Sequence, residues 1–306
     1  MESRRGGVLL MVMLAAGIVA GHARGIPATP RLVLRSASAL VQDQGTGELL
    51  LQKNTDAALP IASITKLMTA MVLLDAQPDL LAPVTILEED KDMLRHSRSR
   101  LPVGTVLTRG EALLLALMAS ENRAAHALGR TYPAGLPAFV AAMNAKAASL
   151  GLTTAHFEDP AGLSSGNVAS ARDLARIVDQ AHHYALIRTC TTQEEITVQG
   201  RTHPIQFHNT NRLLQSSRWR IGLSKTGFID ESGQCLVMQA ELKQRPVLIV
   251  LLDSTGRGAR FGDADRIRQW MEGSDPVTRP VERRVERRVV RVSTRVRKAR
   301  HRRTKA

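Results

Sequence analysis

The chain has 306 residues, of which 43% are hydrophobic and 23% are charged. This composition fits one large globular domain or two small ones, and it excludes a wholly disordered chain and a multi-pass membrane protein. Because there are only two cysteines, Cys190 and Cys235, a disulfide-stapled miniature fold and a multi-cysteine metal module are also excluded. Aromatic residues make up 3% of the chain, which is too few for base-stacking platforms.

The net charge of +14 belongs mainly to the C-terminal tail. Residues 276–306 hold 13 Lys and Arg against Glu282 and Glu286, which gives +11. Residues 1–23 contribute +1, so only +2 remains for residues 24–275. The predicted globular body, over 24–275, is therefore nearly neutral, and the function of the tail is a separate question.

The tail carries valines at every fourth position among its arginines. This pattern predicts either a basic amphipathic helix on an anionic surface or a disordered polycation. In both cases we expect the tail to bind acidic components of a cell envelope. Nucleic acid is not expected as a partner, because the N-terminus indicates export.

The N-terminus has the features of a secretory signal. Arg4 and Arg5 precede the apolar and glycine-rich stretch Gly6–Gly21, and small residues flank His22. We predict a cleaved signal peptide over 1–23 and a periplasmic location. The mature protein would be either free in the periplasm or peripherally associated with the membrane or the cell wall. A membrane anchor is the alternative, but it needs about 20 apolar residues, and this stretch is shorter. In an oxidising compartment the two cysteines could pair, although two buried thiols fit the sequence equally well.

The elements of the body fall into three groups along the chain. Two β-rich runs, 32–41 and 48–53, predict a hairpin. Helical patterns follow, and they predict helices over 64–76, 112–119, 137–150 and 171–183. Two of these helices begin at capping boxes, which are Thr108–Glu111 for 112–119 and Ser170–Asp173 for 171–183. Short apolar runs then predict strands over 221–229, 235–242 and 246–253, the last two joined as a hairpin, before a final helix over 263–272.

Strands therefore stand at both ends of the body and helices in the middle. This order predicts an α+β fold, in which N- and C-terminal strands form one antiparallel sheet flanked by helices, with an inserted helical lobe. The default place for a functional site is a cleft between the sheet and that lobe.

Three short motifs carry residues suited to chemistry on one substrate. Ser63 and Lys66 stand three apart at the start of a predicted helix, so they share a face, and a desolvated Lys66 can act as a base. Ser120-Glu-Asn122 offers a hydroxyl and a carboxamide, and Lys225-Thr-Gly227 places an amine and a hydroxyl on a predicted strand. Each motif alone is compatible with ordinary capping or surface residues.

Together, the three motifs match the set found in penicillin-recognising serine enzymes. Their surroundings resemble the low-molecular-mass D,D-peptidases of the cell wall, which share the β-lactamase-like fold; the matching segments are Pro60–Ala70, Leu117–Asn122, Asp159–Ser164 and Leu223–Gly227. The segments 120–125, 209–212 and 235–240 resemble the D-alanyl-D-alanine endopeptidase branch. The resemblance covers nearly all of 35–272, and it departs from the common pattern at Glu121, where relatives more often have aspartate or glycine.

The resemblance implies a role for each motif residue. Ser63 would be the acylated nucleophile, Lys66 its base and Ser120 the proton relay to the leaving amine. The expected substrate-binding residues are Asn122 for a substrate amide, Lys225, Thr226 and Gly227 for the edge that meets a carboxylate, and Phe228, whose backbone N–H would complete an oxyanion hole with that of Ser63. Peptidoglycan stem peptides would be substrates and β-lactam antibiotics covalent inhibitors. No metal or other cofactor is expected.

The sequence thus predicts a serine D,D-peptidase that cleaves D-alanyl-diaminopimelate cross-links. Two alternatives are a D-alanyl-D-alanine carboxypeptidase that trims pentapeptide stems and a non-catalytic wall-binding module. A third alternative is an α/β-hydrolase with its nucleophile elbow at Gly162–Gly166 and with Asp179 and His208 as partners. That mechanism needs a strand before the elbow and a helix directly after it, and the sequence predicts neither.

Overall fold

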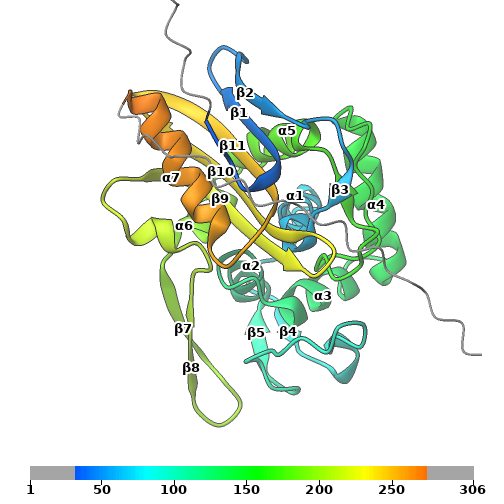
Figure 1. Ribbon diagram of the computed structural model, residues 1–306. Coiled ribbons are helices and arrows are strands. Elements are labelled where there is room, and N and C mark those ends of the chain that lie inside the picture. The colour runs from blue at the N-terminus through cyan, green and yellow to red at the C-terminus, as the bar shows by residue number, and fades with distance from the viewer. Residues whose placement is uncertain (1–31, 274–306) are drawn as a thin grey trace, which may run out of the picture. The chain divides into compact units, whose positions relative to one another are not determined.

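The computed structural model describes residues 32–273, and both the predicted signal peptide and the predicted tail lie outside the described residues. A five-stranded antiparallel sheet, in the order β2-β1-β11-β10-β9, forms the centre (Figure 1). Its strands are β1 (Ser36–Asp43), β2 (Leu49–Lys53), β9 (Arg220–Ile229), β10 (Gly233–Leu242) and β11 (Arg245–Ser254). The predicted α+β class and the joining of N- and C-terminal strands in one sheet are confirmed.

Helices cover both faces of the sheet (Figure 1). Six helices lie between β2 and β9 in the chain: α1 (Lys66–Asp75), α2 (Arg109–Met118), α3 (Asn122–Arg130), α4 (Gly135–Ser149), α5 (Ala171–His182) and α6 (Ala185–Thr192). The helix α7 (Ala259–Glu272) follows β11 and packs on the face opposite to α5. The inserted helical lobe is therefore present as predicted.

Short elements connect the larger ones. Three two-stranded sheets are formed by β3 (Leu59–Pro60) with β6 (Val168–Ala169), β4 (Pro83–Thr85) with β5 (Val106–Thr108), and β7 (Glu195–Gln199) with β8 (Pro204–His208). The 3-10 helices are η1 (Ala62–Thr65), η2 (Glu88–Asp90) and η3 (Arg212–Gln215). The β7–β8 hairpin, which projects from the lobe in Figure 1, was not predicted, because its alternating apolar positions are few.

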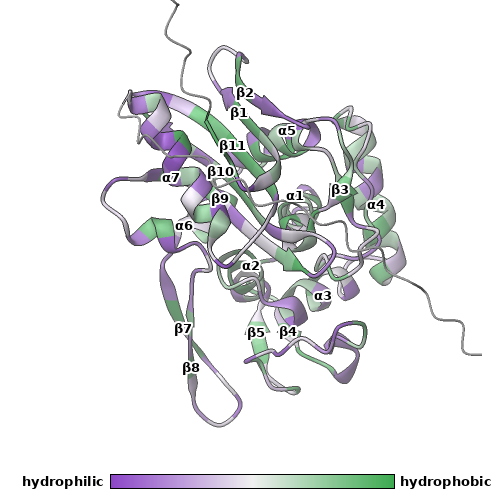
Figure 2. Cartoon of the chain, viewed as in Figure 1, coloured by the Kyte–Doolittle hydropathy of each residue, from purple (hydrophilic) through white to green (hydrophobic). Residues whose placement is uncertain are grey.

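The central sheet lies between two hydrophobic cores, one on each of its faces. On β11, Val247, Ile249 and Leu251 pack with the apolar side of α7, whereas Leu248 and Val250 belong to the larger core under the helical lobe. A central strand with both faces buried must be apolar without interruption, and Figure 2 shows β11 as hydrophobic along most of its length. The same two-sided burial explains why the late strands were predictable from short apolar runs.

The turn and cap chemistry follows the sequence with one exception. Lys243 and Gln244, which connect β10 and β11, have φ of 50° and 60°, as a tight two-residue hairpin turn requires. Thr108 and Glu111 form the predicted capping box at the start of α2.

Of the two hydrogen bonds in the second predicted capping box, only the one accepted by the Ser170 side chain is formed. Ser170 caps α5 by accepting a hydrogen bond from the Asp173 backbone N–H, as expected. The Asp173 carboxylate, however, does not return to the cap; it accepts hydrogen bonds from the backbone N–H and the hydroxyl of Thr154 at 2.7 and 2.6 Å. A buried carboxylate takes the geometry that offers two donors, and Thr154 supplies both.

The two cysteines are free, buried thiols, so the open question of their pairing is answered. Burial raises the pKa of Cys190 and of Cys235 to about 11, which keeps both protonated. Within residues 32–273, no helix has both the length and the apolar content to span a bilayer.

Candidate active site

Ser63 and Lys66 lie where η1 passes into α1. Ser63 is half-buried in η1, and Lys66 is the first residue of α1 with only 1% of its surface exposed. The Nζ atom of Lys66 lies 2.9 Å from the Oγ atom of Ser63, as the three-residue spacing predicts. This pairs a hydroxyl with an amine that the surrounding core shields from water.

Lys66 has two further partners, both of which can only accept hydrogen bonds. Its Nζ lies 2.8 Å from Oδ1 of Asn122 and 2.5 Å from the carbonyl oxygen of Ala161. A neutral amine has two N–H groups and one lone pair. With its two N–H groups on these oxygens, its lone pair is left for the hydroxyl of Ser63. The lone pair of Lys66 therefore faces the hydroxyl of Ser63, as a base for that hydroxyl would require.

The surroundings of Lys66 bring the pKa of its amine close to neutral pH. Desolvation by burial is the largest effect, and it lowers the pKa of Lys66 to about 7. The charge of Asp159 opposes this shift most strongly, followed by those of Glu121 and Asp92. At neutral pH a substantial fraction of Lys66 is therefore unprotonated and able to accept a proton.

Asp159 builds the loop that presents the Ala161 carbonyl. Its two carboxylate oxygens accept hydrogen bonds from four consecutive backbone N–H groups, those of residues 161–164, at 2.7 to 3.2 Å. Asn167 holds the start of the same loop by donating to the Asp159 carbonyl and accepting from its N–H. Gly162 has a φ of 76°, and a Cβ atom there would lie 2.0 Å from the Ala62 carbonyl oxygen, so only glycine fits.

Ser120 and Asn122 lie where α2 passes into α3, and of these two motif residues Asn122 contacts the amine of Lys66. Ser120 has a left-handed backbone with φ 59°, which is unfavourable for a residue with a side chain. Asn122 is the first residue of α3 and bridges two partners, accepting from Lys66 and donating to Oγ of Ser97 at 3.0 Å. Glu121 accepts a hydrogen bond from the Arg123 N–H, and this contact caps the N-terminus of α3.

The third motif lies on β9, the edge strand of the sheet. Lys225 is buried, and its one hydrogen-bond acceptor within residues 32–273 is the carbonyl of Thr226, 3.1 Å from Nζ. Desolvation lowers the pKa of Lys225 well below its usual value, and the positive charges of Lys66 and Arg260 lower it further. A substrate carboxylate would relieve this concentration of positive charge.

Gly227 brings β9 against the start of η1. A Cβ atom on Gly227 would lie 2.7 Å from the Ile61 carbonyl oxygen and 3.3 Å from the backbone nitrogen of Ser63. The backbone of Gly227 and the following Phe228 therefore runs directly beside Ser63, and any side chain at Gly227 would push them apart.

Arg260 is a residue of the site that the sequence did not indicate. From α7 it donates through NH1 to the carbonyl of Gly227 at 2.8 Å and to that of Cys235 at 3.3 Å. Its buried Nε has no hydrogen-bond partner among the described residues. Arg260 is distant in sequence from the three motifs, so no local sequence pattern predicts that it belongs to the site.

The nucleophile-elbow alternative is not supported by the structure. Ser164 lies in a loop and donates to the Glu158 carboxylate. Asp179 accepts from Gln44, and His208 pairs with Glu195 at 3.3 Å. Each of the three would-be triad members therefore has another partner.

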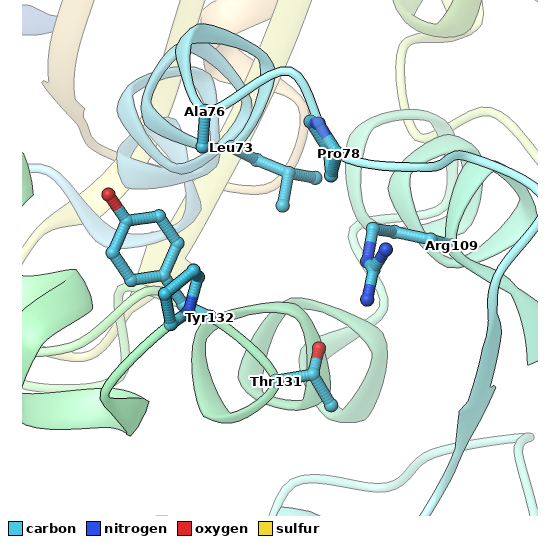
Figure 3. A pocket seen from close by; sticks show the side chains of 7 residues that line it. Leu73, Ala76, Pro78, Arg109, Thr131 and Tyr132 are labelled. Atoms are coloured by element: carbon cyan, nitrogen blue, oxygen red, sulfur yellow. The ribbon is translucent and has the colours of Figure 1, made fainter.

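A separate cavity of about 210 Å³ lies at the far end of α1 from Lys66 (Figure 3). Side chains from the ends of α1 and α3 face each other across it, together with Arg109 at the start of α2. Its one charged residue, Arg109, donates through NH1 to the carbonyl of Asp79 at 2.7 Å. Neither Ser63 nor Lys66 lines this cavity, so it is separate from the candidate site.

Comparison with known proteins agrees with this fold and identifies the family of the chain. A family model described as D-alanyl-D-alanine carboxypeptidase matches residues 26–256. The chain is 47% identical over 242 residues to a D-alanyl-D-alanine endopeptidase of Pseudomonas aeruginosa, and 42% identical over 241 residues to one of Escherichia coli; in both cases the match covers 78% of each chain.

A crystal structure of the DD-transpeptidase of Streptomyces K15 superposes with a TM-score of 0.73 at 29% identity, over 79% of this chain and 98% of that one. Three independent comparisons therefore agree on one group of proteins. The chain belongs to the D-alanyl-D-alanine carboxypeptidase family of serine D,D-peptidases, and it is a hydrolase.

Proposed function

We propose that this protein is a D-alanyl-D-alanine endopeptidase that hydrolyses the amide between D-alanine and diaminopimelate in cross-linked peptidoglycan. The observation that carries the proposal is the set of contacts of Lys66, whose two N–H groups have fixed acceptors while its lone pair faces the hydroxyl of Ser63. The names of the relatives at 47% and 42% identity support the endopeptidase reading.

In the first half of the reaction, Lys66 takes the proton of Ser63 as Oγ attacks the D-alanyl carbonyl carbon. The N–H groups of Ser63 and Phe228 would hold the resulting oxyanion. The C–N bond then breaks, and the proton that Lys66 holds passes through the hydroxyl of Ser120 to the leaving amine, which leaves Lys66 neutral again. The product is a D-alanyl ester on Ser63 together with the released amine.

In the second half, water attacks the ester, and Lys66 again accepts the proton. The ester bond breaks, and the proton returns to Oγ of Ser63, which restores the enzyme and releases the second peptide with a free D-alanine carboxylate. A substrate carboxylate beside Lys225 would favour the protonated form of its amine, whose pKa burial lowers, and would pair with it, with the hydroxyl of Thr226 nearby.

The direct test is labelling of the purified protein by a fluorescent penicillin, followed by mapping of the labelled residue. We expect a stable adduct on Ser63 that is absent from Ser63→Ala. Cross-linked dimer and pentapeptide monomer are then supplied separately. Faster cleavage of the dimer is expected; cleavage of the pentapeptide alone would indicate a carboxypeptidase, and no labelling would indicate a wall-binding protein.

The location and the tail form part of the same proposal. The predicted signal over 1–23 would export the enzyme to the periplasm, and the basic tail over 276–306 would hold it on anionic envelope components. Retention on envelope preparations should then weaken with salt and disappear when 276–306 are deleted. Retention that is independent of salt would contradict this role of the tail.

A further inference from the structure

Directly after β9, Glu231 forms an ion pair with Arg95, whose NH1 atom lies 2.9 Å from Oε2 of Glu231. Seven large hydrophobic side chains are exposed among the described residues, and three of them stand within three positions of this pair. These are Met93, Leu94 and Phe228, with 73%, 63% and 58% of their surfaces exposed. Exposed apolar side chains that adjoin a charged pair in the chain indicate a binding surface.

The pair is held in place relative to the catalytic amine. Arg95 donates through Nε to the carbonyl of Leu163 at 2.5 Å, within the loop that presents Ala161 to Lys66. On the other side, Ser97 accepts from Asn122, which also accepts from Lys66.

The short segment between these anchors is folded on itself. The Asp92 carboxylate accepts hydrogen bonds from the N–H groups of Leu94, Arg95 and Ser97 at 2.9 to 3.0 Å. The position of Arg95 is therefore set by the same network that sets the position of Lys66, as a preorganised binding group requires.

The direction of a bound peptide follows from β9. Because β9 is an edge strand, an extended substrate can lie along it as an added strand. Under the proposed function, the carboxylate on the leaving side meets Lys225, and the carbonyl under attack lies at Phe228. The acyl part then continues past Phe228 toward Glu231.

The chemistry of the next residue fits this end of the cleft. The residue before D-alanine in the proposed substrate is diaminopimelate, whose side chain is an aliphatic chain that ends in one carbon bearing both an ammonium and a carboxylate. The guanidinium of Arg95 uses one N–H for the carbonyl of Leu163 and one for Glu231, and its other N–H groups can bind a ligand. The carboxylate of Glu231 has a second oxygen that can accept from a ligand.

We propose that Arg95 and Glu231 bind the zwitterionic end of the diaminopimelyl side chain of the acyl donor, with Met93, Leu94 and Phe228 against its methylene groups. This subsite rests on the proposed endopeptidase function and adds to it the residues that select the third residue of the stem. Arg95 supplies the fork of donors that matches a carboxylate, and Glu231 accepts from the ammonium.

The test compares two cross-linked dimers with the same acceptor stem and with either meso-diaminopimelate or L-lysine at the third position of the donor. Lysine keeps an ammonium but lacks the second carboxylate. The readout is the ratio of kcat/KM for the two dimers, which does not depend on the fraction of active protein. We expect the wild type to prefer diaminopimelate and Arg95→Gln to lose about tenfold of that ratio, with partial recovery in Arg95→Lys.

The matched control is Arg220→Gln, which breaks the exposed pair of Arg220 and Glu241 at the opposite end of β9, 3.4 Å apart. Its ratio should equal that of the wild type. A second variant, Glu231→Gln, should reduce the preference for the diaminopimelyl dimer over the same dimer with that side-chain amine acetylated.

The outcomes separate the two proposals. A wild type that is labelled by penicillin and cleaves dimer, combined with unchanged ratios in Arg95→Gln and Glu231→Gln, overturns the subsite alone. A wild type that is neither labelled nor active overturns the proposed function, and the subsite with it.

Discussion

The Nζ atom of Lys66 lies 2.5 Å from the carbonyl oxygen of Ala161, a residue from a loop that sequence reasoning did not place in the active site. This contact occupies one of the two N–H groups of a neutral amine and helps to direct its lone pair to Ser63. The activity of the enzyme should therefore follow the protonation of Lys66.

The first prediction concerns the pH dependence of acylation. Because the pKa of Lys66 is lowered to about 7 and we propose the unprotonated amine as the base, the acylation rate should rise about tenfold per pH unit below pH 7 and level off above it. The second-order rate constant for penicillin acylation, measured from pH 5 to 9, gives this profile. A rate that still rises about tenfold per pH unit up to pH 9 would contradict the lowered pKa of Lys66.

The second prediction concerns Asp159. Its negative charge is the largest influence that raises the pKa of Lys66, so Asp159→Asn should move the midpoint of the acylation profile to lower pH. The amide nitrogen cannot accept hydrogen bonds, so the loop should also loosen and the plateau rate should fall.

Glu158→Gln is the matched control for Asp159→Asn, since Glu158 adjoins the same loop, accepts from Ser164 and is not among the charges that shift Lys66. Its midpoint should stay at that of the wild type. An Asp159→Asn midpoint that stays in place or moves upward would refute the electrostatic role.

The third prediction concerns recognition by Lys225. In Lys225→Met, acylation by a penicillin should fall about 10- to 100-fold, because the carboxylate of the antibiotic loses a charge-assisted hydrogen bond. The methyl ester of the same penicillin should react equally slowly with the wild type and the variant. Equal losses for acid and ester in the variant would show that Lys225 acts on something other than the carboxylate.

The same substitution should increase stability. Burial holds the pKa of Lys225 in the folded state well below its usual value, so the unfolded state binds the extra proton. The cost to folding is full below the folded-state pKa and disappears as the pH rises to the unfolded value of about 10.4. Urea denaturation should therefore show Lys225→Met more stable than the wild type at pH 6 and nearly equal at pH 10.5, with the exposed Lys243→Met as the control.

The fourth prediction separates the backbone of Ser120 from its hydroxyl. Both Ser120→Ala and Ser120→Gly remove the hydroxyl that we propose as the proton relay, so peptide hydrolysis should fall by about 10²- to 10⁴-fold in each. Only glycine relieves the left-handed backbone at φ 59°, so Ser120→Gly should be more stable than Ser120→Ala by about 1 kcal/mol. Rapid hydrolysis by either variant would exclude Ser120 as the relay.

The local parts of the fold and of the site were predictable. Helical periodicity alone places Ser63 and Lys66 on one face, and the uninterrupted apolar runs of the late strands reflect burial on both faces of the sheet. These patterns act over a few residues, so they can be read before the chain is folded.

Contacts between distant segments were decided only by the tertiary structure. The carbonyl of Ala161 meets Lys66 and the guanidinium of Arg260 meets Gly227, although each pair is far apart in the chain. The carboxylate of Asp173 was expected at its own helix cap but found two donors on Thr154. Such partners are chosen by how elements pack, since buried polar groups take whichever donors and acceptors the fold brings near them.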